Sequence, residues 1–213
     1  MSAPQAAAGT EVPTGNTYDK YGATNPFVRR LMASFEDSLD ELLARADGEA
    51  RIDSLVDVGC GEGVLTARWA ARLPGRRVVG IDLPDPKLEA HWRESSRKNL
   101  EFTTGRAEQL PFEENEFDLA CAIETLEHVT DPERSVAELA RVARRFVLAS
   151  VPREPLWRAL NLARGAYVRQ LGNTPGHLNH WSRGSFARLL ERHGELAELR
   201  SPLPWTMVLL RIG

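Results

Sequence analysis

The sequence has few cysteines, few lysines and no long apolar run. Its two cysteines, Cys60 and Cys121, lie far apart in apolar surroundings, which excludes a disulfide framework and favours buried, inert thiols in a reducing compartment. No stretch approaches the ~18 uninterrupted apolar residues of a membrane-spanning helix, and no basic segment followed by an apolar run opens the chain. We therefore expect a soluble, cytoplasmic protein.

A strong charge of either sign is also missing. The 27 basic and 30 acidic residues leave a net charge of -3, so the chain as a whole offers no electrostatic attraction to nucleic acid. Lysine occurs only at positions 20, 87 and 98, so nearly all the basic side chains are arginines. Arginine suits forked binding of planar anions, although genome composition explains such a bias equally well.

What is present fits one folded domain with extensions. A chain of 213 residues is long enough for one domain of ~150 residues with additional segments. Residues 1–16 carry Ala, Gly, Pro and Thr without periodicity and predict a disordered leader, which leaves residues 17–213 as a single domain. From Asn25, a candidate N-cap followed by Pro26, apolar residues recur at helical spacing to about Ala46 and predict an opening helix.

Short β-branched runs then alternate with helical stretches. The expected strands cover residues 54–58, 77–81, 100–103, 117–123 and 146–151. The expected helices cover residues 63–73, a stretch from Pro84, and residues 131–143. This alternation is typical of an α/β fold, in which a mostly parallel sheet carries helices on both faces.

The alternation stops after residue 151. Residues 152–181 carry an apolar helical stretch from Leu156 to Leu171 and then a turn-rich segment, and they predict an inserted lid. Ser182 is the expected cap of a last helix, and the runs 196–199 and 205–212 predict an antiparallel strand pair that closes the sheet. The predicted divisions of the domain are residues 52–151, 152–181 and 182–213.

The most specific motif is VDVGCGEG, residues 56–63, at the end of the first expected strand. Gly59, Gly61 and Gly63 allow a tight turn and a close ligand approach, and the helix that follows offers free N–H groups. The dinucleotide pattern G-x-G-x-x-G fails because Val64 stands at its third glycine, and no Gly-Lys-Ser or Gly-Lys-Thr follows to make a phosphate-binding loop. The motif therefore indicates a cofactor site that matches neither pattern.

Residues 55–66, LVDVGCGEGVLT, resemble the first motif of class I S-adenosylmethionine-dependent methyltransferases. VGID, which ends at Asp82, resembles the acidic end of that family's second strand, and GRAEQLPF, residues 105–112, resembles its adenine-side loop. A carboxylate at Asp82 can accept both ribose hydroxyls. The resemblance implies a Rossmann-like, seven-stranded mixed sheet of order 3-2-1-4-5-7-6, with an N-terminal helix and a helical lid between strands 5 and 6.

The resemblance also implies a set of cofactor contacts. Asp57 and the glycine loop would hold the methionine portion of S-adenosylmethionine, Asp82 the ribose, and Leu83 with the 106–108 loop the adenine. The implied cofactor-binding residues are Asp57, Gly59, Cys60, Gly61, Gly63, Asp82, Leu83, Arg106, Ala107, Glu108, Glu124 and Tyr21. Arg106 departs from the family pattern, because an acidic residue often contacts the adenine amino group there; Glu108 or a backbone carbonyl would have to take that contact.

The segment ETLEH, residues 124–128, begins where the fourth expected strand ends, at the edge where open α/β sheets bind ligands. A helical turn here would place Glu124, Glu127 and His128 on one face. In one interpretation His128 has only a structural role and holds a loop in place. In a second, His128 or Glu124 is a general base. In a third, Glu124, Glu127 and His128 bind a divalent cation with His177 or His180, a spacing that resembles small-RNA 2′-O-methyltransferases and some ubiquinone-pathway O-methyltransferases.

Three further segments carry candidate functional side chains. GHLNHWS, residues 176–182, makes His177 and His180 candidates for the substrate and catalytic site, although Trp181 could be a packing anchor and His180 a helix cap. Tyr18 and Tyr21 resemble aromatic residues that close over a sulfonium, and ordinary packing explains them equally well. Arginines in the lid could grip an anion, touch a membrane surface or form a solvated helix face.

We therefore expect a methyltransferase that moves a methyl group from S-adenosylmethionine to an O, N or C atom of a small-molecule acceptor and releases S-adenosylhomocysteine. We expect no nucleic acid partner, no membrane span, and a monomer or homodimer. Two alternatives stay open: a metal-assisted RNA 2′-O-methyltransferase that uses Glu124, Glu127 and His128, and a non-catalytic protein that binds S-adenosylmethionine or a partner.

Overall fold

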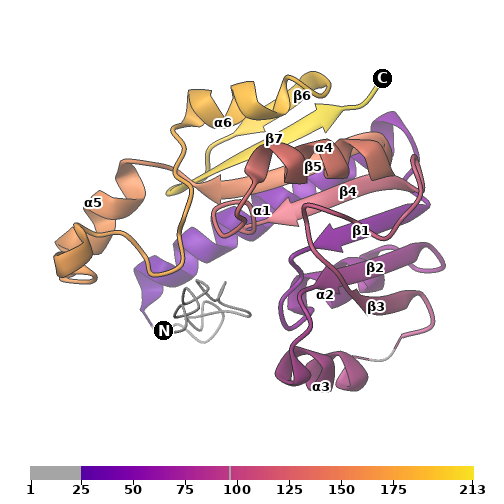
Figure 1. The fold of residues 1–213 in the computed structure, drawn as a ribbon, viewed down its shortest axis with the longest axis horizontal. Coiled ribbons are helices and arrows are strands. Elements are labelled where there is room, and N and C mark those ends of the chain that lie inside the picture. Colours follow the sequence, from indigo (N-terminus) through magenta and orange to yellow (C-terminus); the bar gives the residue numbers. More distant parts are fainter. Residues whose placement is uncertain (1–24, 96) are drawn as a thin grey trace, which may run out of the picture.

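A single mixed sheet organises the protein. The computed structural model describes residues 25–95 and 97–213, and its seven strands run in the order β3-β2-β1-β4-β5-β7-β6 (Figure 1). Strands β1 to β5 are parallel, and β7 is antiparallel to both β5 and β6. The strands are β1 (Ser54–Val58), β2 (Arg77–Asp82), β3 (Leu100–Thr104), β4 (Phe117–Ile123), β5 (Ala143–Pro152), β6 (Glu195–Arg200) and β7 (Trp205–Arg211). The predicted fold class and strand order are confirmed.

Helices cover both faces of this sheet. They are α1 (Pro26–Glu49), α2 (Val64–Arg72), α3 (Pro86–Glu94), α4 (Pro132–Val142), α5 (Leu156–Ala163), the 3-10 helix η1 (Val168–Gln170) and α6 (Arg183–Leu190). Side chains alternate along the strands: Met207 and Leu209 of β7 pack with α1 and α2 in one apolar core, while Val208 and Leu210 pack with α4 and α6 in the other. Two cores with different helices therefore sandwich the sheet.

Helix starts follow their capping residues. The Asn25 side chain accepts a hydrogen bond from the Phe27 N–H at 2.9 Å, and Pro26 occupies the first helical position of α1. Helix α3 begins at Pro86 instead of the predicted Pro84, because Asp85 caps it by accepting from the Lys87 N–H at 2.8 Å. The predicted Ser182 cap of α6 is confirmed.

Two expected elements differ in extent. Strand β5 begins at Ala143, which the helical pattern placed at the end of α4, so the strand starts three residues before the predicted Phe146. The lid does not carry one helix from Leu156 to Leu171: α5 ends at Ala163, and Gly165 and Tyr167 take left-handed backbone angles with φ of 72° and 53°. Apolar spacing alone did not reveal this break.

The expected leader and the candidate aromatic residues Tyr18 and Tyr21 lie outside the residues that the structure describes. Within the described ranges, no helix combines the length and the apolar composition that a membrane crossing requires. Cys60 and Cys121 are both free, and burial raises the pKa of each thiol. Cys121 is buried as expected, whereas Cys60 is only half-buried.

Candidate active site

A cavity of about 580 Å³ opens at the carboxyl edge of the parallel strands, a size suited to a small organic ligand. One part of its wall comes from the ends of β1, β2 and β4, and another from α1, α5 and the start of β7. The predicted site residues that line it are Asp57, Gly59, Cys60, Gly61, Asp82, Leu83, Arg106, Ala107, Glu108, Glu124, Glu127, His128 and His177. Gly63 and His180 are described but are not among the lining residues.

The glycine loop after β1 has three left-handed residues, with φ of 76°, 54° and 79° at Gly59, Gly61 and Gly63. A Cβ at Gly59 would lie 2.3 Å from the Thr125 side chain, and one at Gly63 would lie 2.5 Å from Phe102. A Cβ at Gly61 would meet no protein atom within 4 Å. The outer two glycines are therefore required by the protein's own packing, whereas Gly61 leaves its backbone accessible from the cavity.

Asp82 fixes this loop from the end of β2. Its Oδ2 accepts from the Gly61 N–H and its Oδ1 from the Leu83 N–H, each at 2.7 Å. Since a carboxylate oxygen can accept two hydrogen bonds, Asp82 can still accept from ligand hydroxyls in the cavity. Burial raises the pKa of this carboxyl against the lowering effect of its two backbone donors.

Asp57 lies beneath the loop, on β1, and is almost fully buried. Thr66 of α2 donates to its Oδ2 at 2.6 Å. Burial, opposed by this hydrogen bond, raises the pKa of Asp57 to about 7. Asp57 therefore links the strand that precedes the loop to the helix that follows it.

Trp92 of α3 is a loop anchor that the sequence did not reveal. Its Nε1 donates to the Gly61 carbonyl at 2.8 Å, and its ring stacks on Phe102 at an angle of 4° and a centroid distance of 5.2 Å. The only sequence signal was the helical spacing of Leu88 and Trp92, which equally fits ordinary core packing.

At the adenine-side loop, the Glu108 carboxylate accepts from both the N–H and the hydroxyl of Thr130, at 3.2 and 2.8 Å. The Arg106 Nε lies 3.6 Å from it. Burial raises the pKa of Glu108, but the hydrogen bonds from its own N–H and from Thr130, together with the charge of Arg106, outweigh it, and the net shift is downward. Glu108 therefore stays ionised at the cavity wall and is tied to the start of the α4 region.

Glu124 does not share a helical face with Glu127 and His128. Its φ of 56° is left-handed, which turns the chain away from a helical path directly after β4. Its Oε1 accepts from the Ser150 hydroxyl at 3.0 Å and its Oε2 from the Trp205 Nε1 at 2.7 Å. The side chain thus bridges β5 and β7 at the edge of the cavity.

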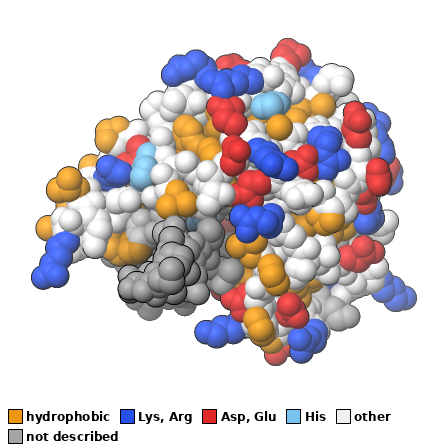
Figure 2. All heavy atoms as spheres, viewed as in Figure 1, with side chains coloured by type: hydrophobic (Ala, Val, Ile, Leu, Met, Phe, Trp, Pro, Cys, Tyr) orange, Lys and Arg blue, Asp and Glu red, His pale blue; other side chains and the backbone are white. Residues whose placement is uncertain are grey.

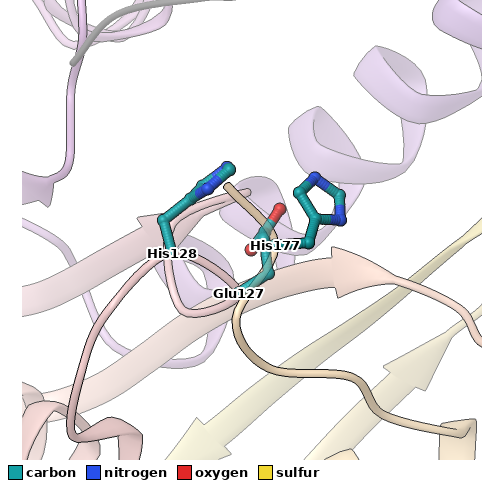
Figure 3. A group of neighbouring side chains, drawn as sticks. All are labelled: Glu127, His128 and His177. Atoms are coloured by element: carbon teal, nitrogen blue, oxygen red, sulfur yellow. The ribbon is translucent and has the colours of Figure 1, made fainter. Parts of the chain in front are cut away.

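Glu127, His128 and His177 form a compact cluster, drawn in Figure 3. One ligand atom from each lies within 4.8 Å of those of the other two, and the two imidazole rings meet edge to face at a centroid distance of 4.9 Å. Glu127 and His177 are 2% and 9% exposed. A carboxylate with two imidazoles suits Zn²⁺, Mn²⁺ or Fe²⁺ better than Mg²⁺, and the same groups can hold or move a proton.

Hydrogen bonds between two loops bring this cluster together. His128 Nδ1 donates to the Gly176 carbonyl at 2.9 Å, and the Glu127 carbonyl accepts from the N–H groups of Leu178 and Asn179 at 2.8 and 3.1 Å. The Asn179 amide donates to two further carbonyls of the turn after β4, at 3.1 and 2.7 Å. The position of His177 therefore depends on tertiary contacts that no local pattern encodes.

His180, the other predicted histidine, lies outside this cluster. Its Nε2 is 2.9 Å from Arg158 Nη2 and 2.7 Å from Asn173 Oδ1. Burial, and then the positive charge of Arg158, lower the pKa of His180. Within the described ranges the candidate cation ligands are thus Glu127, His128 and His177. Of the two histidines considered as a further ligand, His177 joins this cluster, whereas His180 and Glu124 do not.

Residues 56–146 match a family described as a methyltransferase domain. The chain is 32% identical over 159 residues to the ubiquinone biosynthesis O-methyltransferase of Hahella chejuensis, covering 66% of this chain and 65% of that protein. It is 33% identical over 109 residues to 2-methyl-6-phytyl-1,4-hydroquinone methyltransferase 2 of Oryza sativa subsp. japonica, covering 51% and 31%.

Among solved structures, the fold is similar to magnesium protoporphyrin IX methyltransferase of Synechocystis PCC 6803 with bound S-adenosylhomocysteine. The TM-score is 0.63 at 17% identity, over 90% of each chain. The chain spans 31% to 65% of the length of the curated relatives it matches.

Proposed function

We propose that the chain is a class I S-adenosylmethionine-dependent methyltransferase that transfers a methyl group to an oxygen of a small, hydroxylated aromatic acceptor. The observation that carries the proposal is one continuous cavity with two chemically different walls, joined by residues 124–128. We call the wall built by the ends of β1, β2 and β4 the cofactor wall, and the wall built by α1, α5 and the start of β7 the acceptor wall. Thr125 packs on Gly59 of the cofactor wall, and Glu124 is hydrogen-bonded to Trp205 of the acceptor wall. The O-methyltransferases among the relatives support oxygen as the methylated atom.

The residues present fit S-adenosylmethionine. Gly61 presents backbone that a ligand can approach without a Cβ in the way, and Asp82 offers carboxylate oxygens to ribose hydroxyls. Leu83 and Ala107 supply apolar surface for the adenine, beside Arg106 and Glu108. When bound, the cofactor supplies an already activated methyl group on a sulfonium, so the protein's contribution is mainly positioning and exclusion of water.

The second wall of the cavity suits a flat, apolar acceptor. Trp157 and Trp205 face each other at a centroid distance of 5.9 Å and an angle of 55°, and Phe35 packs on Trp205 at 4.6 Å. Such rings favour another aromatic ring as a neighbour. The apolar side chains on this wall are Phe27, Val28, Leu31, Met32, Phe35, Trp157, Leu160, Ala163 and Trp205.

His128 is the group we assign to the acceptor's proton. Because Nδ1 donates to the Gly176 carbonyl, the neutral ring keeps its lone pair on Nε2, where it can accept a proton from an attacking hydroxyl. Loss of that proton makes the oxygen a better nucleophile as it takes the methyl group. Glu127 and His177 then act as positioning residues beside the imidazole.

The spacing within the cluster supports a second candidate role, a divalent cation held by Glu127, His128 and His177. The two roles differ in one measurement, turnover after exhaustive chelation. Unchanged turnover, which we expect, supports the general base. A loss that Zn²⁺ or Mn²⁺ restores would assign the cluster to a cation.

The proposed function is tested by methyl transfer from radiolabelled S-adenosylmethionine to a panel of catechols and hydroquinones, with aromatic amines as the comparison set. We expect label on oxygen, and a kcat/KM for the phenols at least tenfold above that for the amines. Preferential labelling of the amines would overturn the choice of oxygen.

We also propose a cytoplasmic location, supported by the two free cysteines.

A further inference from the structure

Gly61 is the least constrained residue of the glycine loop. Its φ of 54° is left-handed, and a Cβ built on it would meet no protein atom within 4 Å. Because glycine populates positive and negative φ almost equally, the Gly61 backbone does not by itself select one orientation of the peptide that follows. Gly59 and Gly63, by contrast, pack tightly on neighbouring side chains. The orientation of Gly61 must therefore come from the groups that bond to it.

Two side chains hold Gly61, one at each of its backbone polar groups. Asp82 of β2 accepts from the Gly61 N–H at 2.7 Å, and the Trp92 Nε1 of α3 donates to the Gly61 carbonyl at 2.8 Å. The indole of Trp92 is buried and stacks on Phe102 of β3, which fixes the direction of its N–H group. The Gly61 carbonyl is therefore held by a rigid donor.

Helix α3 reaches the cofactor wall through this tryptophan. No residue of α3 lines the cavity, and Leu88 and Trp92 are the buried residues of the helix. Figure 2 shows acidic, basic and apolar side chains together at the lower end of the molecule, where Figure 1 places α3. The exposed side of α3 is thus ordinary solvated surface, and Trp92 connects this peripheral helix to the glycine loop.

The hydrogen bond from Trp92 also orients the peptide that joins Gly61 to Glu62. In a planar trans peptide, the C=O and the N–H point in opposite directions. Because the Gly61 carbonyl points to Trp92, the Glu62 N–H is directed away from α3. Gly61 and Glu62 line the cavity, whereas Trp92 does not, so this N–H lies on the cavity side of the peptide.

We propose that Trp92 is a positioning residue for the amino acid part of the cofactor. It holds the Gly61 carbonyl away from the cavity, so that the Glu62 N–H can donate to the carboxylate of S-adenosylmethionine. Helix α2 begins two residues later, at Val64, and the positive end of its dipole favours an anion at the same place. This role rests on the proposed function, because it takes S-adenosylmethionine as the ligand.

The test compares two ligands by calorimetry. One is S-adenosylhomocysteine; the other is 5′-methylthioadenosine, which keeps the nucleoside and the sulfur but lacks the amino acid part. Trp92→Phe keeps a ring to stack on Phe102 and removes the donor to Gly61. We expect it to weaken S-adenosylhomocysteine binding about three- to tenfold, the loss of one hydrogen bond, and to leave 5′-methylthioadenosine binding unchanged.

Two variants serve as controls. Trp69 of α2 is fully buried, and its Nε1 has no hydrogen-bond partner among residues 25–95 and 97–213. Trp69→Phe therefore makes the same chemical change without removing a hydrogen bond, and it should leave the affinity for both ligands unchanged. Asp82→Ala should weaken the binding of both ligands, because both carry the ribose hydroxyls.

A second measurement needs no ligand. Amide hydrogen exchange at the Gly61 N–H, followed by NMR, reports how often the loop opens and this group leaves Asp82. The exchange should be about three- to tenfold faster in Trp92→Phe than in the parent, and unchanged in Trp69→Phe.

Three results would overturn the assignment. Equal losses for the two ligands in Trp92→Phe would show that Trp92 supports the loop as a whole and does not position it for the amino acid part. Unchanged binding of both ligands would show that the hydrogen bond to Gly61 has no effect on the site. An equal loss from Trp69→Phe would assign the effect to core packing.

Failure of the proposed function looks different. A parent chain that binds neither ligand would contradict S-adenosylmethionine as the cofactor. The exchange rates of the ligand-free chain would then still decide whether Trp92 holds Gly61.

Discussion

The two walls of the cavity are built by different means. On the cofactor wall, Asp57, Gly61 and Asp82 lie at or directly after strand ends, and their positions follow from the parallel register of β1 and β2 and from backbone hydrogen bonds. On the acceptor wall, the residues come from α1, α5 and β7, and α5 is held through side chains such as Trp157, whose Nε1 donates to Thr174 Oγ1 at 2.9 Å. The sheet fixes the first wall, whereas the second depends on helices α1 and α5 and on side-chain contacts around the start of β7.

The largest effect is expected at the junction of the two walls, residues 124–128. His128→Ala should lower kcat by roughly 10²- to 10⁴-fold, the contribution of a positioned general base, with the affinity for S-adenosylhomocysteine unchanged. Steady-state kinetics and calorimetry on the same preparation measure both quantities. His180→Ala is the matched control, since His180 lies outside the cluster, and a comparable loss of kcat there would contradict the assignment.

On the cofactor wall, Asp82→Ala should weaken S-adenosylhomocysteine binding by roughly 10²- to 10⁴-fold. The reason is the loss of a charged acceptor for two hydroxyls, at about 1.5 to 3 kcal/mol for each hydrogen bond to a charged group. Calorimetry measures the change directly. Asp53→Ala, whose carboxylate pairs with Arg51 at the surface, should bind normally, and an unchanged affinity in Asp82→Ala would reject the ribose contact.

A third prediction concerns the cost of the buried carboxyl under the glycine loop. The folded-state pKa of Asp57 is about 7, above its ordinary value of 3.8. Between these two pH values the folded protein keeps a proton on Asp57 that the unfolded chain has lost. The free energy of unfolding therefore falls as pH rises from about 4 toward 7. Asp57→Asn should therefore be more stable than the parent at pH 8, by about 1 to 3 kcal/mol, and not at pH 4. Denaturant unfolding at both pH values measures this, and a pH-independent difference would refute it.

The smallest effect is expected on the acceptor wall. Trp205→Phe keeps an aromatic ring but loses the donor to Glu124, and it should raise the acceptor KM about three- to tenfold while cofactor affinity stays the same. A parallel loss of cofactor affinity would show that the two walls are coupled through Glu124 and are not independent. Kinetics with the acceptor varied at saturating cofactor, together with calorimetry, separate the two outcomes.

The cofactor wall could largely be predicted from the sequence because its signals are local. The three glycines, the acidic end of β2 and the alternation of strands and helices each occupy a few consecutive residues, and the sheet order is confirmed. The contact from Trp92 to Gly61 could not be predicted, because a tryptophan at helical spacing gives the same pattern whether it packs in a core or anchors a loop.

The acceptor wall and the junction of the two walls could be predicted only in part. His128 and His177 were both candidates, but the choice between His177 and His180 depends on which loop carbonyls accept from His128 and Asn179, a matter of tertiary contact. The expected helical turn from Glu124 to His128 failed because Glu124 takes a left-handed conformation, in which its carboxylate reaches Trp205, 81 positions later in the chain. Residue spacing could not indicate either.

The hydrogen bonds between the turn after β4 and the segment 176–179 limit how such a protein can be redesigned. The insertion between β5 and α6 looks like a cassette that could be exchanged for that of a relative to change the acceptor. Yet His128 belongs to the turn after β4, whereas His177 belongs to the insertion. The Gly176 carbonyl of the insertion accepts from His128, and carbonyls of the turn accept from the amides of Leu178 and Asn179. In a working chimera, residues 174–179 must therefore come from one parent, either all with the exchanged insertion or all with the original chain. A junction within these residues would mix the groups of two proteins in the loop that orients His128.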